Sequence, residues 1–90
     1  MVTSQALPVL TFDVLLFASI REAVGRPVVS ASLPPGATVR DLLDALSAAE
    51  PSIARQRRAL AVAVNHAVVG PAHRLAAGDE VALLPPVGGG

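Results

Sequence analysis

The stretch PPGATVRDLLDALSAAE, residues 34–50, contains the clearest helix signal in the chain, and the rest of the fold follows from it. Thr38 stands where an N-cap is expected. Asp41, three residues later, completes the pattern of a capping box and opposes the positive end of the helix dipole. The apolar stripe, near the 3.6-residue period of a helix, consists of Val39, Leu42, Leu43, Leu46 and Ala49. A single helix with one apolar stripe needs a sheet face to cover it.

Strand signals lie on both sides of this helix. Residues 11–20, TFDVLLFASI, are rich in β-branched and aromatic residues and predict a strand that is buried on much of both faces. Residues 28–33, VVSASL, alternate apolar and small polar residues and are close enough in sequence to pair with the first strand as a hairpin. Residues 60–70 predict two short strands joined by a tight turn at Asn65, which tolerates positive φ, and residues 80–84 predict the last strand.

This order of two strands, one main helix and further strands predicts a two-layer α+β domain. A β-grasp fold fits the order, with the helix packed on one face of a mixed sheet and the last strand near the first; other two-layer folds also match the pattern. The chain is expected to divide into a mobile N-terminal extension (residues 1–11), the β-grasp domain (residues 12–84) and an extended C-terminal tail (residues 85–90).

Composition limits the function. At 90 residues, with 52% hydrophobic and 16% charged residues, the chain is expected to form one packed domain. Its formal net charge of zero gives no electrostatic case for binding nucleic acid or an anionic membrane. The absence of cysteine excludes disulfides, thiolate metal sites and a cysteine nucleophile. No apolar run is long enough to span a bilayer and the start does not resemble a signal peptide, so we expect a cytoplasmic protein.

The titratable residues do not predict an active site or a metal site. His66 and His73 are the only imidazoles, and neither has the spacing of a metal ligand set. Asp79 and Glu80 are adjacent, but a turn followed by the start of a strand explains them better than a catalytic pair. No glycine-rich segment has the spacing of a phosphate-binding loop. Any chemistry is therefore expected to involve a partner.

The basic residues are all arginines, because the chain contains no lysine. Three of them, Arg55, Arg57 and Arg58, are concentrated in SIARQRRAL, residues 52–60. A solvated loop or short helix is the favoured interpretation of this segment, and a binding patch is the alternative.

The C-terminal stretch PPVGGG, residues 85–90, has an unusual order of residue types. Its prolines lack the N–H groups that a sheet requires, so strand pairing is expected to stop after Leu84 and the chain to continue extended. Its glycines have no β-carbon and reach roughly 10 Å at full extension, so they fit a narrow channel. We expect the tail to present the carboxylate of Gly90 inside the active site of another protein; a frayed end is the alternative.

Four stretches together resemble a known family. They are VLLFASIREAVG (residues 14–25), AVNHAVV (63–69), HRLAAGDEVALLPPV (73–87) and the final Gly89-Gly90. The chain is similar in these stretches to the ubiquitin-like sulfur carriers, and most closely to the small subunits of molybdopterin synthase. The resemblance covers nearly everything from Phe12 onward.

The resemblance implies a pathway for the tail. An activating enzyme adenylates the Gly90 carboxylate with ATP, and a sulfurtransferase converts the acyl-adenylate into a thiocarboxylate. The large subunit of molybdopterin synthase, in a heterotetramer with the small subunit, then receives the tail, and the sulfur passes to cyclic pyranopterin monophosphate. The small subunit is implied to be a non-catalytic sulfur donor without a permanently bound cofactor, because the catalytic residues belong to the large subunit.

The resemblance also implies site residues. The implied partner contacts are Phe17, Arg21, Val68, Leu84 and Val87, and the implied tail residues are Pro85, Pro86, Gly88, Gly89 and Gly90. Core packing is the alternative for Phe17, Val68 and Leu84, and surface solvation is the alternative for Arg21. The chain has Leu83-Leu84 where many relatives have aromatic residues before the prolines, which bears on affinity for the partner.

Other functions are compatible with the same sequence. The thiamine-thiazole carriers share the fold and the Gly-Gly end but are usually shorter and lack the combination of REAVG and PPV, and a carrier for cysteine or tungsten-cofactor synthesis is a further alternative. A ubiquitin-like protein modifier is a further alternative, although a chain without lysine cannot build lysine-linked polymers on itself. The last alternative is a simple binding module with a frayed tail.

Overall fold

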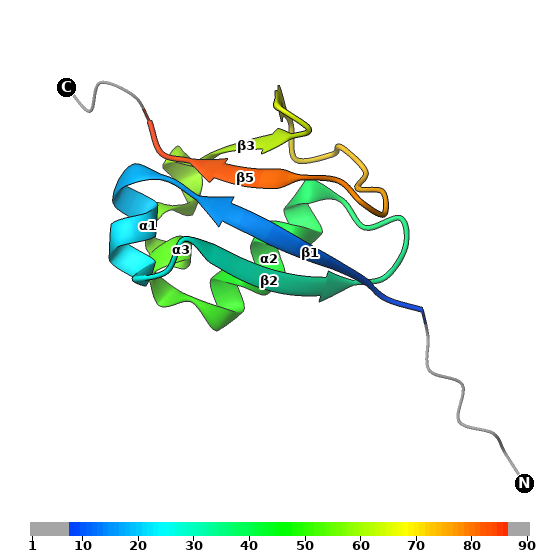
Figure 1. The fold of residues 1–90 in the computed structure, drawn as a ribbon, viewed down its shortest axis with the longest axis horizontal. Coiled ribbons are helices and arrows are strands. Elements are labelled where there is room, and N and C mark those ends of the chain that lie inside the picture. Colours follow the sequence, from blue (N-terminus) through cyan, green and yellow to red (C-terminus); the bar gives the residue numbers. More distant parts are fainter. Residues whose placement is uncertain (1–7, 87–90) are drawn as a thin grey trace, which may run out of the picture.

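The computed structural model describes residues 8–86, and in them five strands form one mixed sheet in the order β2-β1-β5-β3-β4 (Figure 1). The strands are β1 (Leu10–Leu16), β2 (Val28–Leu33), β3 (Ala61–Val64), β4 (Ala67–Val69) and β5 (Val81–Leu84). β1 pairs antiparallel with β2, which confirms the predicted hairpin, and parallel with β5. β3 lies antiparallel to both β5 and β4. The last strand in the sequence is thus the central strand of the sheet.

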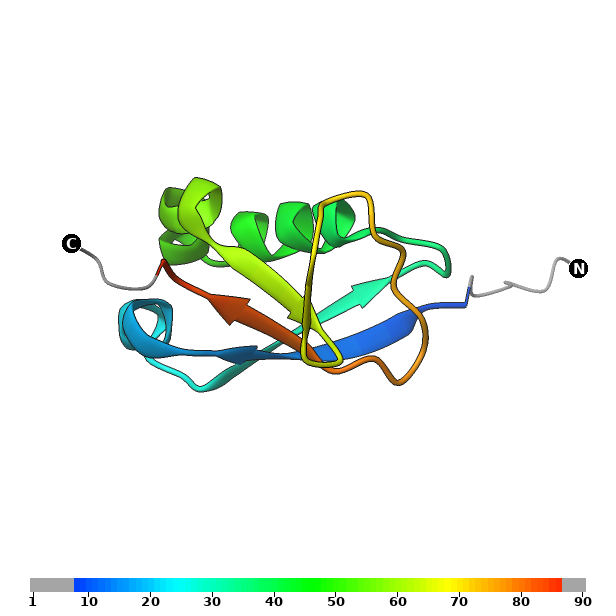
Figure 2. The same cartoon turned by 90° about the horizontal axis from the view of Figure 1, so that it is seen from above.

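The helices leave one face of the sheet open. They are α1 (Ala18–Val24), α2 (Val39–Ala49), α3 (Pro51–Gln56) and the 3-10 turn η1 (Arg57–Ala59). Figure 2 shows α2 and α3 on one side of the sheet, whereas α1 lies at the end where β1 and β5 finish. This arrangement is the predicted α+β β-grasp fold, with α2 as the main helix.

α2 forms as its sequence predicts. The Thr38 hydroxyl accepts a hydrogen bond from the Asp41 N–H, and the Asp41 carboxylate accepts one from the Thr38 N–H at 2.9 Å, so both halves of the capping box are present. Val39, Leu42 and Leu46 are buried against the sheet together with Leu43. Ala49, which was expected to extend this stripe, is exposed.

The core lies between α2 and the covered face of the sheet. Alternate residues of each strand point into it, so β1 contributes Phe12, Val14 and Leu16, and β5 contributes Val81 and Leu83. The loop after β4 closes one end of the core, because the Leu75 N–H donates to the Ala37 carbonyl at 2.9 Å and the Leu75 side chain is buried. Among residues 8–86, no helix is long and apolar enough to cross a membrane.

The first predicted strand was wrong in its end and in its burial, because β1 is buried on one face only. The strand predicted over residues 11–20 ends at Leu16, and α1 follows it. Ala18 adopts a left-handed conformation with φ 49°, which turns the chain out of the strand. Ile20 is then fully buried, and Gly25 ends the helix at φ 86° with its N–H donating to the Arg21 carbonyl.

The predicted turn between β3 and β4 is confirmed. Asn65 and His66 both have positive φ, at 52° and 71°, which is the conformation of a two-residue hairpin turn matched to the twist of the strands. The β3–β4 hairpin formed by this turn lies at one edge of the sheet, with β3 next to β5.

Candidate functional site

The tail begins at the end of the central strand. β5 ends at Leu84, as the two prolines predict, and Pro85 is half-buried while Pro86 is exposed. The other tail residues of the sequence prediction, Val87, Gly88, Gly89 and Gly90, lie outside the described residues. The division of the chain into an extension, a domain and a tail remains a prediction.

An apolar row crosses the open face of the sheet. Leu15 pairs with Ala82, Ala82 pairs with Ala63, and Ala63 pairs with Val68, so the four side chains lie on the same side of neighbouring strands. Val28 of β2 extends the row at the other edge, because it pairs with Leu15. This row passes close to the middle of the sheet on the face that no helix covers.

A second apolar row lies nearer the tail. Leu84 pairs with Ala61, and Phe17 occupies the next position along the neighbouring strand, because Leu16 pairs with Leu83. Phe17 has extended backbone angles (φ −125°, ψ 154°), so its side chain continues on the face of Leu15. We call Leu15, Phe17, Val68, Ala82 and Leu84 the apolar platform.

The platform contains three of the partner contacts that the sequence implied. Phe17 is 44% exposed, Val68 is 69% exposed and Leu84 is half-buried, and none of the three belongs to the core cluster. Core packing, the alternative explanation, therefore does not account for them. Their role in binding a partner stays a prediction.

Arg21 lies one helical turn beyond Phe17. Its backbone N–H donates to the Phe17 carbonyl at 3.4 Å, and its side chain is exposed on α1. The predicted partner contact Arg21 is therefore at the same end of the sheet as the start of the tail (Figure 1). Val87, the fifth predicted contact, lies outside the described residues.

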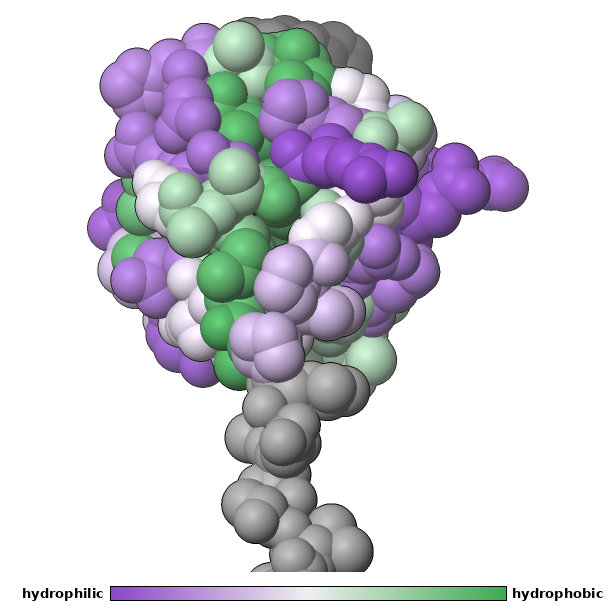
Figure 3. Space-filling model, turned by 90° about the vertical axis from the view of Figure 1, so that its right-hand side faces the viewer, coloured by the Kyte–Doolittle hydropathy of each residue, from purple (hydrophilic) through white to green (hydrophobic). Residues whose placement is uncertain are grey.

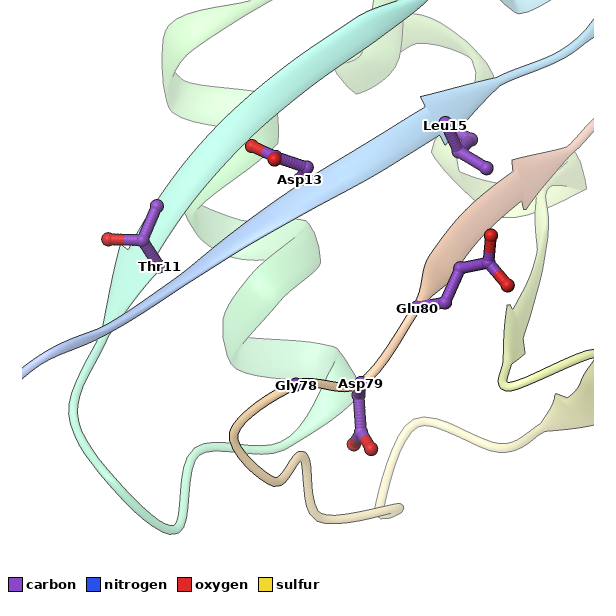
Figure 4. A pocket seen from close by; sticks show the side chains of 6 residues that line it. All are labelled: Thr11, Asp13, Leu15, Gly78, Asp79 and Glu80. Atoms are coloured by element: carbon purple, nitrogen blue, oxygen red, sulfur yellow. The ribbon is translucent and has the colours of Figure 1, made fainter.

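The far half of the open face is polar. Ser30 Oγ donates to Asp13 Oδ1 at 3.0 Å, and the hydroxyls of Thr11 and Ser32 lie 3.0 Å apart. An open hollow of about 350 Å³ lies here. Figure 4 shows its lining, which comes from two segments: Thr11, Asp13 and Leu15 of β1, and Gly78, Asp79 and Glu80 before β5. The open face thus changes from polar to apolar along the strands toward the tail.

The end of the molecule opposite the start of the tail has a mixed surface. Figure 3 views this end and shows hydrophobic surface as a strip between flanks of hydrophilic side chains. No group of three or more His, Cys, Asp or Glu residues in the described part of the chain is arranged to hold a metal ion.

A hydrogen-bonded latch joins the β3–β4 turn to the start of β5. The Asn65 amide donates to Asp79 Oδ1 at 2.9 Å and accepts from the Glu80 N–H at 2.9 Å. The other Asp79 oxygen accepts from the Ala76 N–H at 2.7 Å. The two backbone ends meet as well, because the Asn65 N–H donates to the Glu80 carbonyl. The latch fixes the hairpin that presents Val68 at the edge of the platform.

The hydrogen bonds of the latch shift the pKa of Asp79. The hydrogen bond from the Ala76 N–H, then that from the Asn65 side chain, hold the pKa of Asp79 below its ordinary value, with a smaller effect of His73. His66 Nε2 lies 2.6 Å from Glu80 Oε1 beside the latch, and its side chain is 85% exposed. Asp79 and Glu80 therefore hold a turn in place, as their sequence position predicted.

Sequence reasoning missed two members of the platform, Leu15 and Ala82. Both were assigned to strands, but the face on which they lie depends on which strand pairs with which and in what register. The alternation of Val81, Ala82, Leu83 and Leu84 carried part of this signal, since Ala82 and Leu84 must share one face of β5.

The fold and the site together define a class. A β-grasp sheet with a helix across one face, and a central last strand that leads into a proline-glycine tail, is the architecture of a ubiquitin-like protein. A solved structure of small archaeal modifier protein 1 from Haloferax volcanii superimposes with a TM-score of 0.76 at 34% identity, over 89% of this chain and 99% of that one.

Sequence comparison gives the family. The ThiS family matches residues 14–90. A molybdopterin synthase sulfur carrier subunit of Escherichia coli K12 is 40% identical over an alignment of 79 positions that covers 86% of this chain and 96% of the relative. One from Arabidopsis thaliana is 35% identical over 77 residues, with coverages of 86% and 80%. The chain therefore belongs to the ThiS family, the ubiquitin-like β-grasp sulfur carriers.

Proposed function

We propose that this chain is the sulfur carrier of molybdenum cofactor biosynthesis. In this proposal the Gly90 carboxylate attacks ATP in an activating enzyme and pyrophosphate leaves. A sulfur donor then delivers sulfide-level sulfur to the acyl carbon, which releases AMP and leaves a thiocarboxylate. The large subunit of molybdopterin synthase receives the tail and transfers the sulfur to cyclic pyranopterin monophosphate. The similarity to relatives named molybdopterin synthase sulfur carrier subunits supports this pathway.

The position of the apolar platform is the observation that carries the proposal. Exposed apolar side chains that gather on one face favour protein contact, and here they border the strand end that leads into Pro85 and Pro86. A partner seated on the platform is therefore next to the start of the tail. Glycines beyond the prolines allow the reacting carboxylate to enter a channel that a side chain would block.

The proposed roles divide between the chain and its partners. This chain supplies the docking surface and the sulfur-bearing carboxylate, and it needs no permanently bound cofactor for either task. The large subunit supplies the catalytic residues in a cytoplasmic heterotetramer, while ATP is consumed in the activating enzyme. Phe17, Arg21, Val68, Leu84 and Val87 are the proposed contacts.

Intact mass spectrometry tests the proposal. The purified chain is incubated with ATP, a matching activating enzyme and a sulfur source, and an exchange of one oxygen for sulfur at Gly90 is the expected result. The thiocarboxylated chain should then give molybdopterin when mixed with the large subunit and cyclic pyranopterin monophosphate.

Tail-length variants provide the matched controls. Deleting Gly90, or adding one residue after it, should leave the fold intact and abolish sulfur delivery, because the reacting atom must lie within about 3–3.5 Å of its target. Normal molybdopterin synthesis by either variant would contradict the proposal, and so would an unchanged mass in a competent activating system.

A protein modifier is the second candidate, and the similarity to small archaeal modifier protein 1 favours it. Isopeptide adducts between Gly90 and lysines of other proteins would support this role. Transfer of sulfur to a thiazole precursor, a cysteine precursor or a tungsten-cofactor precursor would instead assign the carrier to another pathway.

A further inference from the structure

The arginines are distributed unevenly over the molecule. Arg21 on α1, Arg55 on α3 and Arg58 on η1 are all exposed, and among residues 8–86 no carboxylate lies within 4.0 Å of any of them. We call these three residues the arginine collar. The only acidic side chain in α1, α3 and η1 is that of Glu22.

The helices that carry the collar meet at the start of the tail. Ser52 Oγ of α3 donates to the Ala23 carbonyl of α1 at 3.2 Å, and Arg55 Nη2 donates to Ser52 Oγ at 3.3 Å. η1 follows α3 directly and leads into β3, whose first residue, Ala61, pairs with Leu84. α1, α3 and η1 therefore gather around the end of the sheet from which the tail leaves (Figure 1).

The other arginines at this end are neutralised locally. Arg26 forms an ion pair with Glu50, and Arg57 forms one with Asp44 at 2.7 Å. Among the described residues at this end, the three arginines of the collar are therefore the ones whose positive charge is available to another molecule.

Acidic side chains gather at the other end of the open face. Asp13, Asp79 and Glu80 line the hollow in Figure 4. Charges of both signs lie at each end, but they are unequal: the tail end carries Arg21, Arg26, Arg55, Arg57 and Arg58 against Glu22, Asp44 and Glu50, and the opposite end carries Asp13, Asp41, Asp79 and Glu80 against Arg40 and Arg74. Among the described residues the molecule therefore has a positive pole at the start of the tail and a negative pole opposite it. A charge separation of this kind orients a protein as it approaches a charged surface.

We propose that Arg21, Arg55 and Arg58 form an electrostatic docking surface for an acidic rim on the protein partner that receives the tail. This inference rests on the proposed function, because it needs a partner that takes up the tail. Guanidinium groups suit such a rim, since they bind carboxylates through two parallel hydrogen bonds and lose less hydration than an ammonium. A net charge of zero and three free arginines favour a protein rim over nucleic acid.

The rim must lie outside the channel that receives the tail. The tail ends in an anion, so the inner end of the channel has to accept negative charge and cannot itself be acidic. The six residues from Pro85 to Gly90 reach roughly 20 Å when fully extended, which exceeds two Debye lengths of about 8 Å at physiological salt. The collar and the reacting carboxylate can therefore contact surfaces of opposite charge on one partner.

Association kinetics test the collar. The double variant R55E/R58E is compared with R40E/R74E, which makes the same change in net charge on arginines at the other end of the molecule. The probe is the purified large subunit of molybdopterin synthase, measured by stopped-flow at about 50 mM and about 500 mM salt. At low salt we expect R55E/R58E to associate about tenfold more slowly with a dissociation rate within about twofold, and R40E/R74E to stay within about twofold.

Further measurements separate the possible failures. The difference should vanish at high salt, and R55Q/R58Q should show a smaller slowing in the same direction, with unchanged thermal unfolding of all variants. Equal rates for R55E/R58E and R40E/R74E would overturn the collar while leaving the proposed function intact. The collar would also be overturned if the wild-type chain bound duplex DNA and R55E/R58E lost that binding while it associated normally with the large subunit. A wild-type chain that binds neither the large subunit nor the activating enzyme would contradict the proposed function and the collar with it.

Discussion

Leu83 and Leu84 are identical neighbours in β5 that lie on opposite faces of the sheet. Leu83 is fully buried in the core, whereas Leu84 is half-buried on the apolar platform beside the start of the tail. Their backbone environment is almost the same, since both pair with β3. The comparison shows that one central strand fills the core through one face and leaves apolar side chains accessible on the other, where we propose that the partner binds.

The largest expected effect comes from the covered face. Leu83→Ala should lower the free energy of unfolding by about 2–5 kcal/mol, because it removes buried apolar atoms and leaves a cavity among close-packed side chains. Urea denaturation followed by circular dichroism measures the change, with Leu84→Ala as the matched control, for which we expect less than about 1 kcal/mol. Equal losses for the two variants would break the distinction between the faces.

A smaller effect is expected on the open face. Leu84→Asp should weaken binding to the large subunit by at least about tenfold, because an unpaired carboxylate would be placed in an apolar contact. Isothermal titration calorimetry measures the affinity, and Ser32→Asp, on the polar half of the same face, is the control that should bind normally. Unchanged affinity of Leu84→Asp would remove Leu84 from the interface.

The smallest effect concerns the latch that holds the hairpin beside the platform. Folding lowers the pKa of Asp79, so the ionised carboxylate is favoured in the folded state. Its stabilisation is fully present above the unfolded pKa of about 3.9 and is lost as the pH falls through the lower folded pKa.

The Asp79→Asn variant tests this titration. The wild-type chain should lose stability more steeply than Asp79→Asn as the pH falls from about 5 to below 4. Thermal unfolding across that range provides the measurement. Parallel curves for the two proteins would show that Asp79 does not contribute to the acid sensitivity.

The main helix could be predicted from sequence because its signals are local. The capping residues Thr38 and Asp41 and the stripe of four buried side chains lie within one helix, and each position is decided by its near neighbours. The same holds for the turn at Asn65, where side-chain chemistry and backbone conformation agree.

α1 could not be predicted in the same way. Its seven residues continue an apolar run from β1, and seven residues are too few to distinguish the helical period from that of a buried strand. The change occurs at Ala18, whose left-handed conformation is unusual for alanine and has no signature in the local sequence. Ile20 and Val24, four residues apart ahead of Gly25, were the available signal.

The site was predictable only in part for a related reason. Phe17, Val68 and Leu84 came from the resemblance to sulfur carriers, and the structure brings them to one face. Leu15 and Ala82 complete the platform through the parallel register of β1 and β5, which joins segments far apart in the sequence. The collar depends on the packing of α1 against α3, and the charge pattern of residues 52–60 alone did not distinguish it from a solvated surface.

The central position of β5 has a consequence for the folding pathway. Strands β1 and β3 have no direct pairing with each other and are joined only through β5, so the sheet cannot assemble until the last strand of the sequence is available. The pairing of Val14 with Val81 closes a long loop, and such contacts slow folding. During synthesis the domain should therefore fold late and cooperatively, and a chain truncated before Val81 should remain unfolded. A tail would then be presented to its partners only by molecules that have completed their fold.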